Sequence, residues 1–267
     1  SFMTIIAAVQ MISTPSVTEN IATARQWIQQ AVKQGATMVL LPEYWAILGL
    51  QDTDKLAIAE PLGMGPIQDF MRDMAQQHQV WIIGGTLPLQ SSEMGKVLNT
   101  TLVYNPAGEC IAQYNKMHLF SFSNGTERYD ESHTLLGGSN ISSFETPFGR
   151  VGLSVCYDLR FPELYRALGD CTLIVVPSAF THTTGQAHWE ILLRARAIEN
   201  QCYVLAAGQG GQHLNGRRTW GHSMLIDPWG EIVAVLPEGE GIVVGTLDLQ
   251  RLNDIRQKLP ALLHRKL

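Results

Sequence analysis

The order of apolar strands and amphipathic helices, used twice along the chain, is the feature that most restricts the fold. In each half, short apolar runs alternate with stretches whose apolar residues recur at helical spacing, and a hairpin ends the half. The first half is expected to contain strands at 5–10, 37–41, 80–86, 98–104 and 110–114, with helices at 20–34 and 65–78. The second half is expected to contain strands at 151–155, 172–177, 203–208, 222–227 and 232–236, with helices at 162–168 and 187–200.

Strands that alternate with helices are typical of an α/β protein, and the hairpins make the sheets mixed rather than purely parallel. Two such halves pack most simply with their sheets face to face. We therefore expect a four-layer α-β-β-α sandwich with two mixed sheets and an internal pseudo-repeat. No Gly-rich or Pro/Ser-rich linker separates the halves, so we expect one domain over residues 3–267, with Ser1 and Phe2 as a cloning scar.

The composition excludes several classes of protein. Of 267 residues, 45% are hydrophobic and 16% are charged, which is enough apolar material for a large core. The net charge of -5 is modest and no basic stretch recurs, so nucleic acid is not an expected partner. No apolar run approaches bilayer length and no signal-peptide pattern is present, so we expect neither a membrane partner nor secretion.

Four cysteines lie far apart in the sequence, at Cys110, Cys156, Cys171 and Cys202. Because no C-x-x-C pair occurs, we interpret them as reduced thiols in a cytoplasmic protein. The nearest histidine pair is separated by six positions, which fits no common metal-ligand signature. We expect no metal and no cofactor.

Cys156 lies where a buried strand is expected to stop and a helix to begin. Residues 151–155 are apolar and β-branched residues are frequent among them, whereas Pro162 and Glu163 suit the first turn of a helix. A thiol at this junction is expected to face solvent, and helix amides or a nearby cation would favour its nucleophilic thiolate form. A free cysteine is also commonly a small buried hydrophobic residue, so both interpretations stay open at this point.

Two other strand ends carry groups that would complete a mechanism with such a thiol. Glu43 follows the apolar run at 37–41, and Lys116 follows the strand at 110–114. A thiolate can attack an amide carbonyl while a carboxylate relays protons and a lysine, with the backbone amide of Tyr157, stabilises the oxyanion. Taken alone, Glu43 could equally be a helix N-terminal acid, and Lys116 a solvated loop charge.

Three segments resemble the signature blocks of the nitrilase, or carbon-nitrogen hydrolase, superfamily and occur in its order. They are Leu-Leu-Pro-Glu43, Tyr-Asn-Lys116-Met-His-Leu-Phe and Val-Cys156-Tyr-Asp-Leu-Arg-Phe-Pro-Glu. The resemblance runs from Met3 to Arg265 and implies the sandwich fold, a homodimer and an amidohydrolase. It implies Glu43 as general base, Lys116 as oxyanion stabiliser and Cys156 as the acylated nucleophile. It also implies that Glu131, in Tyr-Asp-Glu131-Ser-His, orients Lys116 or the substrate amide.

Later segments resemble the Nit branch of this superfamily, which includes amidases that act on deaminated glutathione and on 2-oxoglutaramate. The segments are 177–180, 184–190, 194–201, 221–224 and 227–230, and the loop 208–213 resembles the former amidases more. The resemblance implies cleavage of deaminated glutathione into 2-oxoglutarate and Cys-Gly. The alternatives are an ω-amidase acting on 2-oxoglutaramate, another small-amide or carbamoyl hydrolase and, last, a non-catalytic binding protein on the same scaffold.

Both candidate substrates are small molecules with a 2-oxo acid end, so a cation is expected to bind their carboxylate. Arg160 is the candidate, because a guanidinium can hold a carboxylate through two hydrogen bonds. The alternative for Arg160 is a salt bridge to Glu163 or another acid. Phe180 and Thr181 are expected to form a pocket wall. The loop at 121–126 departs from the family pattern and leaves the substrate open.

Overall fold

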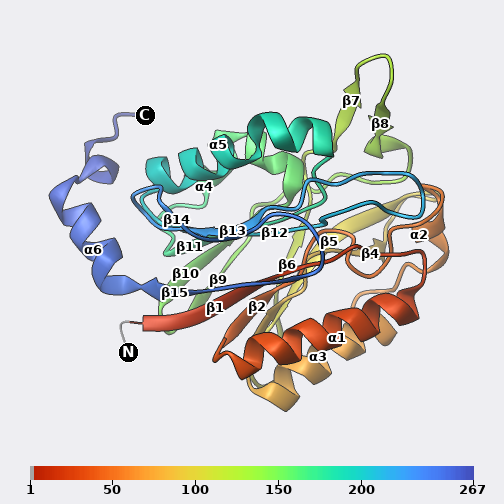
Figure 1. Cartoon of the computed structure of the whole chain (residues 1–267), viewed down its shortest axis with the longest axis horizontal. Coiled ribbons are helices and arrows are strands. Elements are labelled where there is room, and N and C mark those ends of the chain that lie inside the picture. The colour runs from red at the N-terminus through yellow and green to blue at the C-terminus, as the bar shows by residue number, and fades with distance from the viewer. Residues whose placement is uncertain (1–2) are drawn as a thin grey trace.

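The computed structural model describes residues 3–267; the expected cloning scar, residues 1 and 2, lies outside this part. Two large sheets lie face to face, and helices cover the outer face of each (Figure 1). Helices α1 (Val17–Lys33) and α3 (Pro66–His78) cover one sheet, whereas α4 (Pro162–Ala167) and α5 (His182–Asn200) cover the other. The expected four-layer α-β-β-α sandwich is confirmed.

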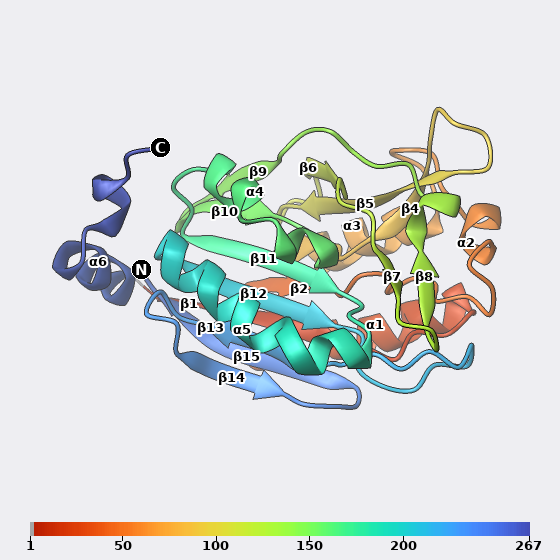
Figure 2. The ribbon, with the colours of Figure 1, turned by 90° about the horizontal axis from the view of Figure 1, so that it is seen from above.

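The described strands form two large mixed sheets and a small separate one. The first sheet contains β1 (Met3–Gln10), β2 (Met38–Leu40), β3 (Trp81–Ile83), β4 (Leu87–Gln90), β5 (Val97–Tyr104), β6 (Cys110–Asn115) and β15 (Gly241–Asp248). The second contains β9 (Ser143–Thr146), β10 (Gly149–Leu153), β11 (Leu173–Ser178), β12 (Tyr203–Gly208), β13 (Ser223–Ile226) and β14 (Ile232–Leu236). The hairpin of β7 (Ser121–Ser123) and β8 (Arg128–Asp130) lies near the short helix α2 (Asp54–Ala57), and α6 (Leu249–Lys258) lies near the C-terminus (Figure 2).

The pseudo-repeat is visible in the strand order. The first sheet runs β15-β1-β2-β3-β5-β6, and its extra strand β4 also pairs with β5. The second sheet runs β9-β10-β11-β12-β13-β14. In both sheets the first pair of neighbours is antiparallel, the next two pairs are parallel and the last two are antiparallel. The two halves therefore share one topology.

The sheets carry apolar side chains on both faces because each is covered on both sides. In β1, Ile6 and Ala8 belong to the core cluster shared with the second sheet, whereas Ala7 and Val9 pack with the cluster beneath α1. Successive side chains of a strand point to opposite faces, so this alternation fills two layers at once. No helix in the described part of the chain has the length and apolar character needed to cross a bilayer.

Several element boundaries differ from those expected. Helix α1 begins at Val17 because the Ser16 hydroxyl accepts a hydrogen bond from the Glu19 amide at 3.2 Å, and α5 begins at His182 because Thr181 caps it. The strand expected at 80–86 ends at Ile83. Two residues later, Gly85, with φ of 51°, turns the chain towards β4.

Candidate active site

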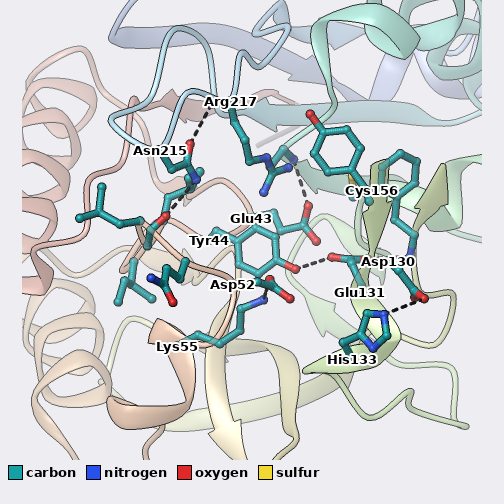
Figure 3. A pocket seen from close by; sticks show the side chains of 18 of the residues that line it. Glu43, Tyr44, Asp52, Lys55, Asp130, Glu131, His133, Cys156, Asn215 and Arg217 are labelled. Atoms are coloured by element: carbon teal, nitrogen blue, oxygen red, sulfur yellow. Dashed lines mark hydrogen bonds and ion pairs between the residues drawn. The ribbon is translucent and has the colours of Figure 1, made fainter. Parts of the chain in front are cut away.

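Three strand ends bring Glu43, Lys116 and Cys156 together in one cavity of about 500 Å³, shown in Figure 3. Glu43 follows β2, Lys116 directly follows β6, and Cys156 begins a short 3₁₀ helix after β10. The Lys116 Nζ lies 2.9 Å from the Glu43 Oε2 and 2.7 Å from the Glu131 Oε1. All four predicted catalytic side chains therefore line the same space.

Glu43 is held by donors from both sheets. Its Oε2 accepts hydrogen bonds from Lys116 and, at 2.9 Å, from the Asn99 amide of β5. Its Oε1 accepts one from the backbone N–H of Ala179, just after β11, at 3.0 Å. A buried carboxylate is tolerated only when it is paired and hydrogen-bonded in this way, so the contacts fix both its charge and its direction.

Glu131 occupies the other side of Lys116. Its Oε1 accepts hydrogen bonds from Lys116 and, at 2.7 Å, from the Phe120 amide, and its Oε2 accepts one from the Tyr44 hydroxyl. Lys116 thus lies between two carboxylates, which fixes its ammonium in the cavity. Figure 3 shows Tyr44 and Glu131 directed toward each other.

The charges around the thiol set its protonation. Burial raises the pKa of Cys156 well above 9.0, the Glu43 carboxylate raises it further, and Lys116 only partly opposes them. Burial also raises the pKa of Glu43 above 4.5, whereas burial of Lys116 is outweighed by Glu131 and Glu43, which raise its pKa. The expectation of a solvent-facing, low-pKa thiol is wrong, since Cys156 is 7% exposed. These shifts favour a neutral Cys156 thiol near the Glu43 carboxylate.

The backbone at the site is strained. Cys156 has φ of 47° and Tyr44, directly after Glu43, has φ of 57°, both in the left-handed region that non-glycine residues rarely adopt. The turn around Cys156 is closed by the Asp158 carboxylate, which accepts a hydrogen bond from the Val155 amide at 2.8 Å. Strain of this kind persists only where the surroundings impose it, and it is concentrated at functional sites.

The predicted substrate-binding residues line a second, narrower hollow that also contains Cys156. Tyr157, Arg160, Phe180 and Thr181 lie there, outside the 500 Å³ cavity. The Arg160 guanidinium lies 5.5 Å from the centre of the Phe180 ring, and its Nη1 lies 3.1 Å from the His188 Nδ1. Thr181 serves as the N-cap of α5 through a bond from the Thr184 amide.

Comparison with known proteins identifies the family. A family model described as carbon-nitrogen hydrolase matches residues 5–257. The chain belongs to the carbon-nitrogen hydrolase family. This confirms the resemblance seen in the three signature blocks and makes the protein a hydrolase.

Relatives of this carbon-nitrogen hydrolase match it over most of its length. It is 44% identical over 265 residues to a protein named deaminated glutathione amidase from Synechocystis sp., with 97% of each chain covered. The structure of the Caenorhabditis elegans NitFhit protein matches with a TM-score of 0.91 at 39% identity, covering 99% of this chain and 65% of that one. Saccharomyces cerevisiae Nit3, described as a member of branch 10 of the nitrilase superfamily, matches with a TM-score of 0.86 at 30% identity, covering 97% and 94%.

Several site residues of this carbon-nitrogen hydrolase were not predicted from its sequence. Asn99 lies inside a strand, Tyr44 follows the predicted base, and Arg217 comes from the loop between β12 and β13. Only Tyr44, through its position beside Glu43, carried a signal that could have been used. Among residues 3–267, no group of three or more His, Cys, Asp or Glu side chains could hold a metal ion.

Proposed function

We propose that this carbon-nitrogen hydrolase cleaves deaminated glutathione into 2-oxoglutarate and Cys-Gly through an acyl-enzyme on Cys156. The observation that carries the mechanism is that Cys156, Glu43 and Lys116 line one cavity, with Lys116 held between Glu43 and Glu131. The full-length relative named deaminated glutathione amidase supports the choice of substrate.

In the first half-reaction, the Cys156 sulfur attacks the amide carbonyl carbon while Glu43 accepts the thiol proton. The carbonyl oxygen becomes an oxyanion, which the Lys116 ammonium stabilises. When the carbon–nitrogen bond breaks, protonated Glu43 returns the proton to the leaving nitrogen. Cys-Gly departs with a free amine, and the 2-oxoglutaryl group stays on Cys156 as a thioester.

In the second half-reaction, Glu43 accepts a proton from a water molecule, and the hydroxide oxygen attacks the thioester carbonyl. Lys116 again stabilises the oxyanion. The sulfur–carbon bond then breaks, and the thiolate regains the proton from Glu43. One water is consumed, 2-oxoglutarate is released and the neutral thiol is restored.

We propose that Arg160 binds the 2-oxo acid carboxylate beside Cys156 and that Tyr157, Phe180 and Thr181 form the surrounding wall, since all four line the hollow with Cys156. The hollow measures only about 10 Å³, so these side chains must move apart to admit the acyl end. 2-Oxoglutaramate has the same acyl end, so an ω-amidase is the alternative function. The two substrates differ only in the leaving group.

We also propose a single domain over residues 3–267, a homodimer and a cytoplasmic location. Exposed apolar side chains on α5 and β14, namely Ile191, Ile198, Val233 and Val235, support a dimer contact. The four cysteines are all free, which agrees with a reducing compartment.

The acyl-enzyme is tested by mass spectrometry of protein quenched after brief exposure to deaminated glutathione. We expect a 2-oxoglutaryl adduct on Cys156, and neither adduct nor turnover in Cys156→Ala. The matched control is Cys110→Ala, because Cys110 is an exposed thiol outside the cavity. Full activity in Cys156→Ala would contradict the mechanism, and a clearly higher kcat/KM for 2-oxoglutaramate would reject the preferred substrate.

A further inference from the structure

The 500 Å³ cavity and the narrow hollow meet at the nucleophile. They share Phe120, Cys156 and Ala179, and their other lining residues differ. Because the narrow hollow has a volume of only about 10 Å³, whatever is attached to the scissile nitrogen must lie in the larger cavity. An ammonia leaving group needs almost none of this space, whereas cavities of several hundred Å³ suit molecules with many heavy atoms.

Most basic side chains that line the larger cavity already have acidic partners. Lys55 lies 2.7 Å from the Asp52 carboxylate, and Lys116 lies between its two glutamates. His133 lies 3.4 Å from the Asp130 carboxylate. These groups therefore have little unbalanced charge with which to bind a carboxylate of the substrate.

Arg217 differs from them. Among residues 3–267 it forms no ion pair, and its buried Nε has no hydrogen-bond partner. Its guanidinium lies 5.1 Å from the centre of the Tyr129 ring, which holds it against the β7–β8 hairpin, and Figure 3 shows it beside the cavity near Tyr44 and Glu43. A buried donor without a partner is costly, so this one has the character of a site prepared for an anion.

The backbone beneath Arg217 is fixed. The Asn215 side chain accepts a hydrogen bond from the Arg217 amide at 2.9 Å and donates one to the Gly49 carbonyl at 2.9 Å. The loop that carries Arg217 is thereby tied to the segment between β2 and α2, which forms another wall of the cavity. Arg128, the other arginine of the cavity, is exposed on the hairpin and less suited to bind a desolvated anion.

We propose that Arg217 binds the C-terminal carboxylate of the peptide that leaves, and so selects an amide of a short peptide with a free C-terminus over an amide of ammonia. This inference rests on the proposed function and deepens it. Arg160 would bind one carboxylate of deaminated glutathione and Arg217 the other, with Cys156 between them. A charge-assisted hydrogen bond from a guanidinium to a carboxylate is among the stronger polar contacts in proteins.

The test compares Arg217→Gln with wild type on deaminated glutathione, on 2-oxoglutaramate and on deaminated glutathione whose glycine carboxylate is capped as an amide. We expect Arg217→Gln to lower kcat/KM for deaminated glutathione by about tenfold to a hundredfold and to leave 2-oxoglutaramate hydrolysis unchanged. Capping the glycine carboxylate as an amide should lower the kcat/KM of the wild type to a similar degree. The same capping should have little effect on the kcat/KM of Arg217→Gln. The matched control is Arg218→Gln, since Arg218 is exposed, pairs with Glu238 and lies outside the cavity lining.

An equal loss on deaminated glutathione and 2-oxoglutaramate would overturn the inference, because Arg217 would then act on the acyl end or on the fold. The inference would also fail if Arg128→Gln, rather than Arg217→Gln, removed the effect of capping. A wild-type enzyme that hydrolyses 2-oxoglutaramate but leaves deaminated glutathione intact would contradict the proposed function itself.

Discussion

Lys116 separates two carboxylates, those of Glu43 and Glu131, and this arrangement decides how Cys156, the proposed nucleophile, is activated. With Glu43 and Glu131 ionised and Lys116 protonated, the cluster already carries a net negative charge, so a resting thiolate would add a second one beside them. The pKa of Cys156 is accordingly high. The proton must leave while the sulfur–carbon bond forms, and Glu43, itself less acidic than an ordinary glutamate because of burial, is the group in position to accept it.

This protonation pattern predicts the pH dependence of kcat/KM. Glu43 works only when ionised, so activity should fall as the pH drops through its pKa, which burial raises above 4.5. On the alkaline side, kcat/KM should stay level past pH 9, because the pKa of Cys156 and that of Lys116 are both raised well above their usual values. The measurement is kcat/KM from pH 4 to pH 10. A descending limb below pH 9 in an intact protein would rule out a neutral resting thiol.

At the scale of elements, the 3₁₀ helix that carries Cys156 is joined to the end of β6 through Asp158. This buried carboxylate accepts hydrogen bonds from the Tyr114 hydroxyl at 2.6 Å and, on its other oxygen, lies 2.7 Å from the His118 Nδ1. Tyr114 and His118 flank Lys116 by two positions on each side. We therefore propose that Asp158 is a positioning residue that sets Lys116, the proposed oxyanion donor, relative to Cys156, the proposed nucleophile.

Replacing Asp158 with Asn should lower kcat by about tenfold to a hundredfold with little change in KM, because small displacements of reacting groups are costly. Tyr114→Phe, which removes one of the bonds, should lower kcat less. Asp73→Asn, at an exposed position of α3 outside the cavity lining, is the control. Steady-state kinetics and thermal unfolding of the same samples distinguish a positioning role of Asp158 from a purely structural one. A lower melting temperature with unchanged kcat would make Asp158 merely structural.

The sequence predicted best those elements that are buried on both faces. Strands such as β2, β11 and β12 form apolar runs because both sides of the sheet are covered. Glu43, three positions past the end of β2, and Lys116, directly after β6, could be assigned to the site. The β7–β8 hairpin was missed because its strands, Ser-Phe-Ser and Arg-Tyr-Asp, are short and polar. Arg217 was missed because its place depends on contacts such as that of Asn215 with Gly49, 166 positions away.

At the scale of the whole molecule, the two sheets pack closely against each other at a glycine. A Cβ on Gly245, in β15 of the first sheet, would lie 2.5 Å from the Leu225 Cδ2 and 3.5 Å from the Val233 Cγ1 of the second. Overpacking of a core costs about 1 to 3 kcal/mol. We therefore expect Gly245→Val to lower the melting temperature by about 2 to 12 °C. Thr246→Val, at the adjacent exposed position, is the control, and equal melting temperatures for both variants would contradict tight packing here.

The hydrogen bond from the Ala179 amide to Glu43 joins residues 136 positions apart and crosses from one half of the pseudo-repeat to the other. Glu43 and Lys116, the proposed base and oxyanion stabiliser, come from the first half and Cys156, the proposed nucleophile, from the second, although each half has a similar topology. A chain with both sheets formed but not yet docked would have native circular dichroism and an inert thiol. Turnover should therefore be the last native property to return during refolding, which makes it a more stringent measure of correct folding than secondary structure.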